Sequence, residues 1–76
     1  GAVRTNGSVL VRRRGRGWEL LAYPREGGFV VDLNVSRFPM PAQVRCVGGA
    51  APAIQPVRQG SWWRLRLNGA RAYHWE

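Results

Sequence analysis

Apolar and polar residues alternate with a period of two along most of the chain, and this alternation limits the fold more than any other feature. The clearest stretch is FVVDLNV, in which Phe29, Val31, Leu33 and Val35 fall on one side. A period of two places successive side chains on opposite faces of an extended strand. Helical periodicity is nearly absent, so we expect an all-β fold.

The alternation predicts six or seven short strands within one small domain, residues 1–76. We expect strands over residues 8–14, 18–23, 29–35, 42–46 and 62–67, a weak edge strand near 54–58, and a last strand through Tyr73 and Trp75. Short strands at roughly 8–12-residue spacing are typical of small sandwiches and barrels. The prediction is an antiparallel β-sandwich, with an OB-like or SH3-like barrel as the alternative. The start at Gly1 without Met indicates a domain excised from a longer protein.

Glycine and proline mark the connections between these strands. Turns are expected at Gly15–Gly17, at residues 24–28 and at residues 59–61, where glycine supplies the positive φ that turns require. The two prolines within residues 36–41 indicate a crossover to another sheet. Asn68-Gly69 is the strongest local signal, because this dipeptide between two strand patterns predicts a type I′ hairpin.

All twelve basic residues are arginines, and with four acidic residues they give a net charge of +8. Such a charge attracts polyanions, although an arginine-only composition rich in Ala, Gly and Pro is also typical of GC-rich codon usage. In VLVRRRGRGWELLAY, the residues Arg12, Arg14 and Arg16 are basic-patch candidates that could contact phosphates while Trp18 stacks on a base. We favour the second interpretation, a tight hairpin, because both flanks of the arginine run carry strand patterns.

The carboxylates fit ion pairing better than catalysis. Glu19 and Asp32 are expected on adjacent strands, where the surrounding arginines would pair with them. His74 is expected to face solvent and has no orienting carboxylate close in sequence apart from Glu76. Cys46 alternates with Val44 and is expected to be a small buried apolar residue. The sequence therefore predicts no catalytic constellation, no metal site and no cofactor.

The aromatic residues divide into core candidates and one outward candidate. Trp18, Phe29, Trp63, Tyr73 and Trp75 lie on the more apolar faces and are expected in the core. If Trp63 points inward, then its neighbour Trp62 points outward.

Trp62 would then share the outward face with Arg64 and Arg66, and these three residues are the ligand or interdomain contact candidates. A large outward indole on a small domain indicates a contact with a sugar ring, a base or a neighbouring domain.

The order of the segments GWELLAYPREGGFVVDL, FPMPAQVRCVGG and WWRLRLNGARAYHW resembles that of the small C-terminal β-sandwich domains of multi-domain glycoside hydrolases, over residues 8–75. The resemblance implies a non-catalytic accessory domain that packs on a catalytic domain of the same parent chain or binds glycan weakly. It also implies a secreted or periplasmic location, and a role for Trp62 in an interdomain surface or a sugar platform.

Two further functions remain open. A nucleic-acid-binding barrel is the first alternative, because tryptophan and arginine interleave in WWRLRL. A protein-interaction module is the second. A membrane partner is not expected, because no apolar run approaches the ~20 residues that a membrane span needs.

Overall fold

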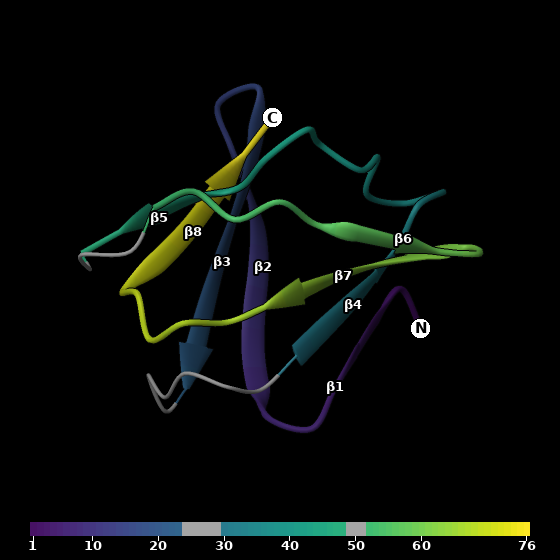
Figure 1. Cartoon of the computed structure of the whole chain (residues 1–76), viewed down its shortest axis with the longest axis horizontal. Coiled ribbons are helices and arrows are strands. Elements are labelled where there is room, and N and C mark those ends of the chain that lie inside the picture. The colour runs from purple at the N-terminus through teal and green to yellow at the C-terminus, as the bar shows by residue number, and fades with distance from the viewer. Residues whose placement is uncertain (24–29, 49–51) are drawn as a thin grey trace.

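The structure is a computed structural model, and it describes residues 1–23, 30–48 and 52–76. These residues form two four-stranded antiparallel sheets, drawn in Figure 1. The first sheet has the order β1-β4-β7-β6, with β1 at Val3–Thr5, β4 at Val30–Asn34, β7 at Trp62–Arg66 and β6 at Val57–Gln59. The second has the order β2-β3-β8-β5, with β2 at Ser8–Arg14, β3 at Gly17–Tyr23, β8 at Ala72–Trp75 and β5 at Arg45–Val47.

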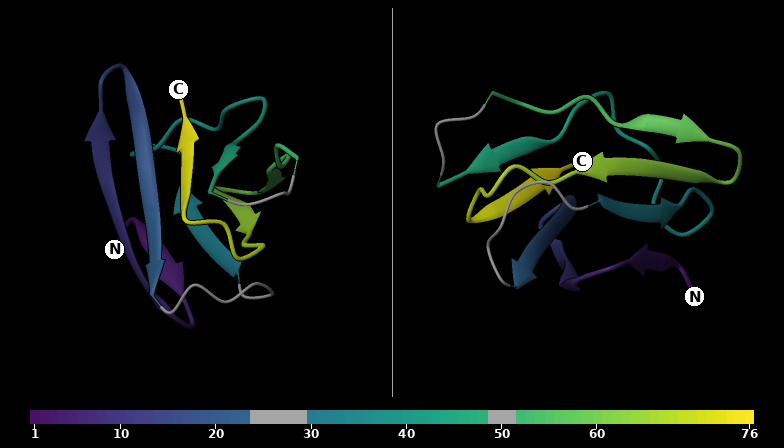
Figure 2. Two further views of the ribbon diagram at one scale, coloured as in Figure 1. Left: turned by 90° about the vertical axis from the view of Figure 1, so that its left-hand side faces the viewer. Right: turned by 60° about the horizontal axis from the view of Figure 1, so that its bottom comes forward.

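The two sheets face each other across one hydrophobic core, which confirms the predicted β-sandwich rather than a barrel (Figure 2). Trp63 and Tyr73 are the largest fully buried side chains, and Leu20, Leu33 and Leu65 are equally inaccessible. The indoles of Trp63 and Trp75 meet edge to face, with their ring centroids 5.3 Å apart. Alternate residues of the central strands therefore fill the core, as their period of two requires.

Most of the expected strands are present in the described residues. The strands expected at 8–14, 18–23 and 62–67 correspond to β2, β3 and β7. The strand expected over 42–46 is shorter and shifted to β5, so Ala42 lies outside it and is exposed. The three-residue strand β1 was not predicted, because three residues are too short to show a period.

Two of the expected turns are tight hairpins of one kind. The turn residues Gly15-Arg16 join β2 to β3, and Gly60-Ser61 join β6 to β7. In each, the glycine is the first turn residue and has a positive φ, 59° and 62°. Glycine at that position is the mark of a type II′ turn, which suits the twist of antiparallel strands. The turn expected at 24–28 lies outside the described residues.

The predicted type I′ hairpin at Asn68-Gly69 is wrong. The strands on either side, β7 and β8, belong to different sheets, so the segment between them is a crossover. Gly69 has a φ of 85°, but Asn68 has no positive φ, which a type I′ turn would require of both residues.

A tyrosine hydroxyl holds this crossover. The backbone amides of Asn68 and Ala70 donate hydrogen bonds to the Tyr73 hydroxyl at 3.0 and 3.2 Å, and the hydroxyl donates to the Asn68 side-chain oxygen. The Asn68 side chain also accepts from the Ala70 amide. Asparagine thus serves here as a polar anchor for the chain as it passes from one sheet to the other.

The crossover predicted at residues 36–41 is confirmed, since β4 and β5 lie in different sheets. Phe38 anchors this connection in the core, where its carbonyl accepts a 2.7 Å hydrogen bond from the Trp63 indole Nε1. Trp18 packs edge to face on Phe38, with their centroids 4.8 Å apart, and is half-buried. Phe29, also predicted to lie in the core, is outside the described residues.

Candidate functional site

The outer face of the β2-β3-β8-β5 sheet carries a row of charged and polar side chains across all four strands. Arg12 on β2 lies opposite Glu19 on β3, Glu19 lies opposite His74 on β8, and His74 lies opposite Arg45 on β5. Side chains in such a cross-strand row point the same way and lie close enough to interact. The row therefore joins residues from positions 12, 19, 45 and 74 into one surface.

Glu19 and His74 form the centre of the row. The carboxylate of Glu19 lies 2.7 Å from His74 Nε2, and each residue is only 8% exposed. Arg12 donates to the other oxygen of Glu19 at 2.7 Å, and Arg14 Nε lies 3.8 Å from Glu19 Oε2. The expectation that His74 faces solvent is wrong: His74 points outward from the sheet, but its neighbours on the sheet face leave little of it accessible.

The contacts of His74 fix its tautomer. Arg14 Nη1 lies 3.3 Å from His74 Nδ1, and a guanidinium can only donate hydrogen bonds. Nδ1 must therefore accept, so the proton of the neutral ring lies on Nε2 and is donated to Glu19. The hydrogen bonds from His74 and then Arg12 lower the pKa of Glu19, outweighing the desolvation that raises it. Glu19 is thus ionised at neutral pH.

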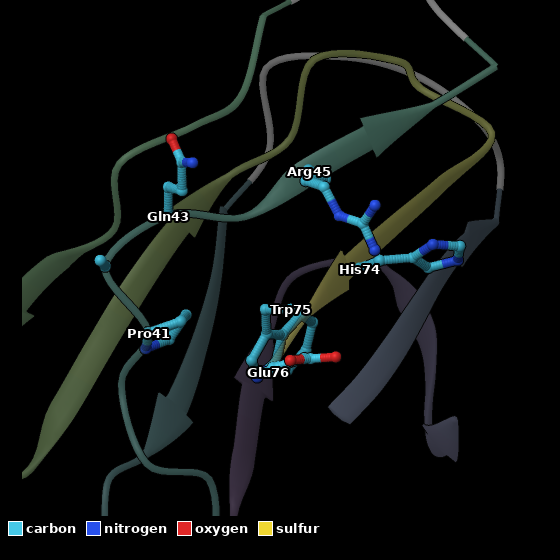
Figure 3. A pocket seen from close by; sticks show the side chains of 7 residues that line it. Pro41, Gln43, Arg45, His74, Trp75 and Glu76 are labelled. Atoms are coloured by element: carbon cyan, nitrogen blue, oxygen red, sulfur yellow. The ribbon is translucent and has the colours of Figure 1, made fainter. Parts of the chain in front are cut away.

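A shallow pocket of about 430 Å³ lies at the β5 end of this row, on the face shown in Figure 3. Gln43, from the segment before β5, and Glu76, the residue after β8, also line it. The pocket thus combines hydrogen-bond donors from the guanidinium and the amide with acceptors from the amide and the carboxylate. Its lining residues are Pro41, Ala42, Gln43, Arg45, His74, Trp75 and Glu76.

Gly17 keeps the neighbouring β3 backbone close to this region. A Cβ atom on Gly17 would meet the backbone carbonyl oxygen of Trp75 and the side chain of Glu76. Only a residue without a side chain permits this approach of β3 to the end of β8.

The outer face of the other sheet holds a second buried carboxylate between arginines. Asp32 on β4 accepts hydrogen bonds from Arg64 on β7 at 2.8 and 3.2 Å and from Arg4 on β1 at 3.3 Å. The hydrogen bonds from Arg64 are the first cause of a lowered pKa of Asp32. The predicted ion pairing of both acids is confirmed, but their expected placement on adjacent strands is wrong, because Glu19 and Asp32 lie in different sheets.

Trp62, Arg64 and Arg66 share the outward face of β7, while Trp63 and Leu65 are buried. The guanidinium carbon of Arg4 lies 3.8 Å from the centroid of the Trp62 ring, a cation–π contact. Trp62 is half-buried as a result, and part of its ring already has an intramolecular partner.

The two predicted arginine groups lie on different sheets. Arg12 and Arg14 contact Glu19 on the outer face of the second sheet, and Arg16 is an exposed turn residue of the β2–β3 hairpin. Trp18 points to the inner face, as expected of a core residue, and packs against the core there, with Arg13 over its ring at 4.8 Å. The candidates Arg64 and Arg66 belong to the outer face of the first sheet.

Three further features concern the described residues. Cys46, expected to be buried, is half-buried; it lies opposite Tyr73, and its Sγ accepts a hydrogen bond from the side-chain nitrogen Nδ2 of Asn68 at 3.4 Å. Within residues 1–23, 30–48 and 52–76, no three His, Cys, Asp or Glu side chains gather as metal ligands would. The same residues include no helix that is long and apolar enough to cross a membrane.

Sequence reasoning found Arg12 and Arg14 but missed the pocket. Gln43, Arg45 and Glu76 belong to no motif, and the pocket forms only because β5 pairs with β8. Compared with known proteins, the chain matches no family model, no curated protein and no solved structure.

Proposed function

We propose that this chain is a non-catalytic accessory β-sandwich domain of a carbohydrate-active enzyme, and that it binds glycan weakly through the pocket lined by Gln43 and Arg45. The observation that carries the proposal is the composition of that pocket. An amide, a guanidinium and the Glu76 carboxylate line one hollow, together with Trp75 and Pro41. Such planar groups form paired hydrogen bonds with neighbouring hydroxyls. The open shape of the pocket fits weak binding.

A partly apolar row of side chains lies beside the charged row on the outer face of the same sheet. It supports the other activity expected of an accessory domain, packing on a catalytic domain. Leu10 lies opposite Leu21, and Val47 lies opposite Ala72, so these residues continue one row across the sheet. Leu10 is 45% exposed, and Tyr23 at the end of β3 is 56% exposed. Large apolar side chains gathered on one open sheet face favour contact with another protein surface.

The arrangement of the arginines gives less support to nucleic-acid binding. A nucleic-acid surface needs one continuous basic face along which phosphates can lie. Here the arginines of β2 and those of β7 lie on different sheets, and a buried carboxylate takes up charge within each group.

The proposal is tested by titrating the isotopically labelled chain with soluble oligosaccharides, neutral and acidic, and following the backbone amide resonances. We expect shifts at Gln43, Arg45 and Glu76. Gln43→Ala removes one amide from the pocket and is expected to weaken binding severalfold. The matched control is Gln59→Ala, an exposed glutamine on β6 of the other sheet, which is expected to bind as the unsubstituted chain does.

Two results would contradict the proposal. If no saccharide shifts the amide resonances, the chain does not bind glycan. If the shifts lie around Trp62 and Gln59→Ala weakens binding, the site lies on the other sheet. Binding of an oligonucleotide that weakens steeply with salt, without saccharide binding, would favour the nucleic-acid alternative.

A further inference from the structure

Arg45 differs from Arg12, the other arginine of its row, in that its side chain has no protein partner among the described residues. Both nitrogens of its neighbour His74 are occupied, one by Glu19 and the other by Arg14. Both oxygens of Glu19 are also occupied, by Arg12 and by His74. The row therefore leaves Arg45 no acceptor, although Arg45 lies directly opposite His74.

The free guanidinium lines the pocket. Figure 3 shows the Arg45 side chain extending towards His74, beside the pocket that Gln43 and Glu76 also line. Arg45 is exposed, so water satisfies its donors in the free protein. A carboxylate can replace that water with two parallel charge-assisted hydrogen bonds, the arrangement that guanidinium groups favour.

Glu76 restricts which anion can enter. Its carboxylate accepts hydrogen bonds and repels negative charge, a doubly charged phosphate group more strongly than a singly charged one, so it favours a singly charged ligand with hydrogen-bond donors of its own. It suits a ligand that carries hydroxyl donors beside a single carboxylate. Gln43 lines the same pocket as Arg45, so the pocket offers an amide that can both donate and accept hydrogen bonds as well as the guanidinium.

We infer that the pocket recognises a uronic acid residue of a glycan, with the sugar carboxylate on Arg45 and the ring hydroxyls on Gln43 and Glu76. This inference rests on the proposed glycan-binding function and adds the chemical class of the sugar. Binding is reversible and involves no covalent step. The net charge of +8 adds a general attraction for acidic polysaccharides, which the experiment must separate from recognition at Arg45.

Three saccharide probes and two variants make that separation. The probes are an oligogalacturonate, its methyl ester, and a neutral galacto-oligosaccharide of the same length. The variants are Arg45→Gln and Arg66→Gln. Arg66 is the matched control, because it is an exposed arginine on the outer face of the other sheet and has no protein partner in the described part of the chain. Each variant lowers the net charge by one. Affinity is measured by the amide resonance titration at physiological salt.

We expect the oligogalacturonate to bind the unsubstituted chain and Arg66→Gln with equal affinity. It should bind Arg45→Gln at least about tenfold more weakly, because this variant loses a pair of charge-assisted hydrogen bonds. The methyl ester, in which the carboxylate charge is removed, is expected to bind the unsubstituted chain no more tightly than the oligogalacturonate binds Arg45→Gln. Equal loss in both variants would show a general charge effect and overturn the inference. Equal binding of the neutral sugar and the oligogalacturonate would overturn the inference while leaving the proposed function intact. Binding of none of the three would overturn both.

Discussion

Trp63 and Trp75 offer a comparison in which one hydrogen bond separates two otherwise similar substitutions. Both indoles are buried, at 0% and 3% exposure, and each packs edge to face on the other. Trp63 Nε1 donates to the Phe38 carbonyl at 2.7 Å. Trp75 Nε1 is buried and has no hydrogen-bond partner in the described residues.

Replacing either tryptophan by phenylalanine removes the same atoms from the core and weakens the same ring contact. Trp63→Phe also leaves the Phe38 carbonyl buried without a donor, which costs about 1–3 kcal/mol. Trp75→Phe instead removes an N–H group that is already buried and unpaired, so it carries no such cost. We therefore expect Trp63→Phe to lower the free energy of unfolding by about 1–3 kcal/mol more than Trp75→Phe does.

Thermal unfolding followed by far-ultraviolet circular dichroism measures this difference without depending on tryptophan fluorescence. For a domain of this size, each kcal/mol corresponds to about 4–8 °C in the melting temperature. The matching reference is Trp18→Phe, in which the replaced indole is only half-buried. A melting temperature for Trp75→Phe equal to or below that of Trp63→Phe would refute the reasoning, because the buried hydrogen bond would then contribute nothing.

Three other outcomes follow from the same structure. Gly17→Ala places a Cβ atom against the backbone of β8 and is expected to destabilise the domain by more than Gly60→Ala, where the added atom meets open space and only the φ of 62° is unfavourable. Urea midpoints measure both losses of stability, and equal losses would contradict the close approach of Gly17 to β8. Tyr73→Phe is expected to cost about 1–3 kcal/mol in urea unfolding, because the Asn68 backbone amide loses its acceptor and the Ala70 amide keeps only the Asn68 side-chain oxygen; an unchanged midpoint would mean that water replaces the hydroxyl. The pKa values of Glu19 and Asp32 are lowered in the folded state. Their contribution to stability is therefore complete above their ordinary pKa values near 4 and is lost as the pH falls through the lowered values. Urea midpoints should decrease below about pH 4, and the double variant Glu19→Gln, Asp32→Asn should not show this decrease.

The sequence predicted those parts of the fold that depend on local patterns. The period of two placed β2, β3 and β7, and glycine placed the two tight hairpins, because strand faces and positive φ are properties of neighbouring residues. The outward position of Trp62 followed from the same alternation. In each case the interactions that determine the local structure involve fewer than ten consecutive residues.

The misplaced features depend on which strands pair. Asn68-Gly69 has the residues of a hairpin, but β7 pairs with β4 and β6, and β8 pairs with β3 and β5, so the turn becomes a crossover. His74 meets Glu19 across 55 positions of sequence, a contact that no local pattern indicates. The candidate pocket has the same origin, since the pairing of β5 with β8 brings Arg45 to His74.

The two open sheets end in four edge strands, and each of these carries at least one arginine: Arg4 on β1, Arg12 on β2, Arg45 on β5 and Arg58 on β6. An edge strand presents backbone groups to which a strand from another molecule can add, and charged side chains on the edge discourage that addition. At a net charge of +8, two copies that approach edge to edge also repel each other over the range that salt allows. The arginines thus help to keep so small and strand-rich a domain from aggregating through its edges, a benefit that does not depend on any ligand.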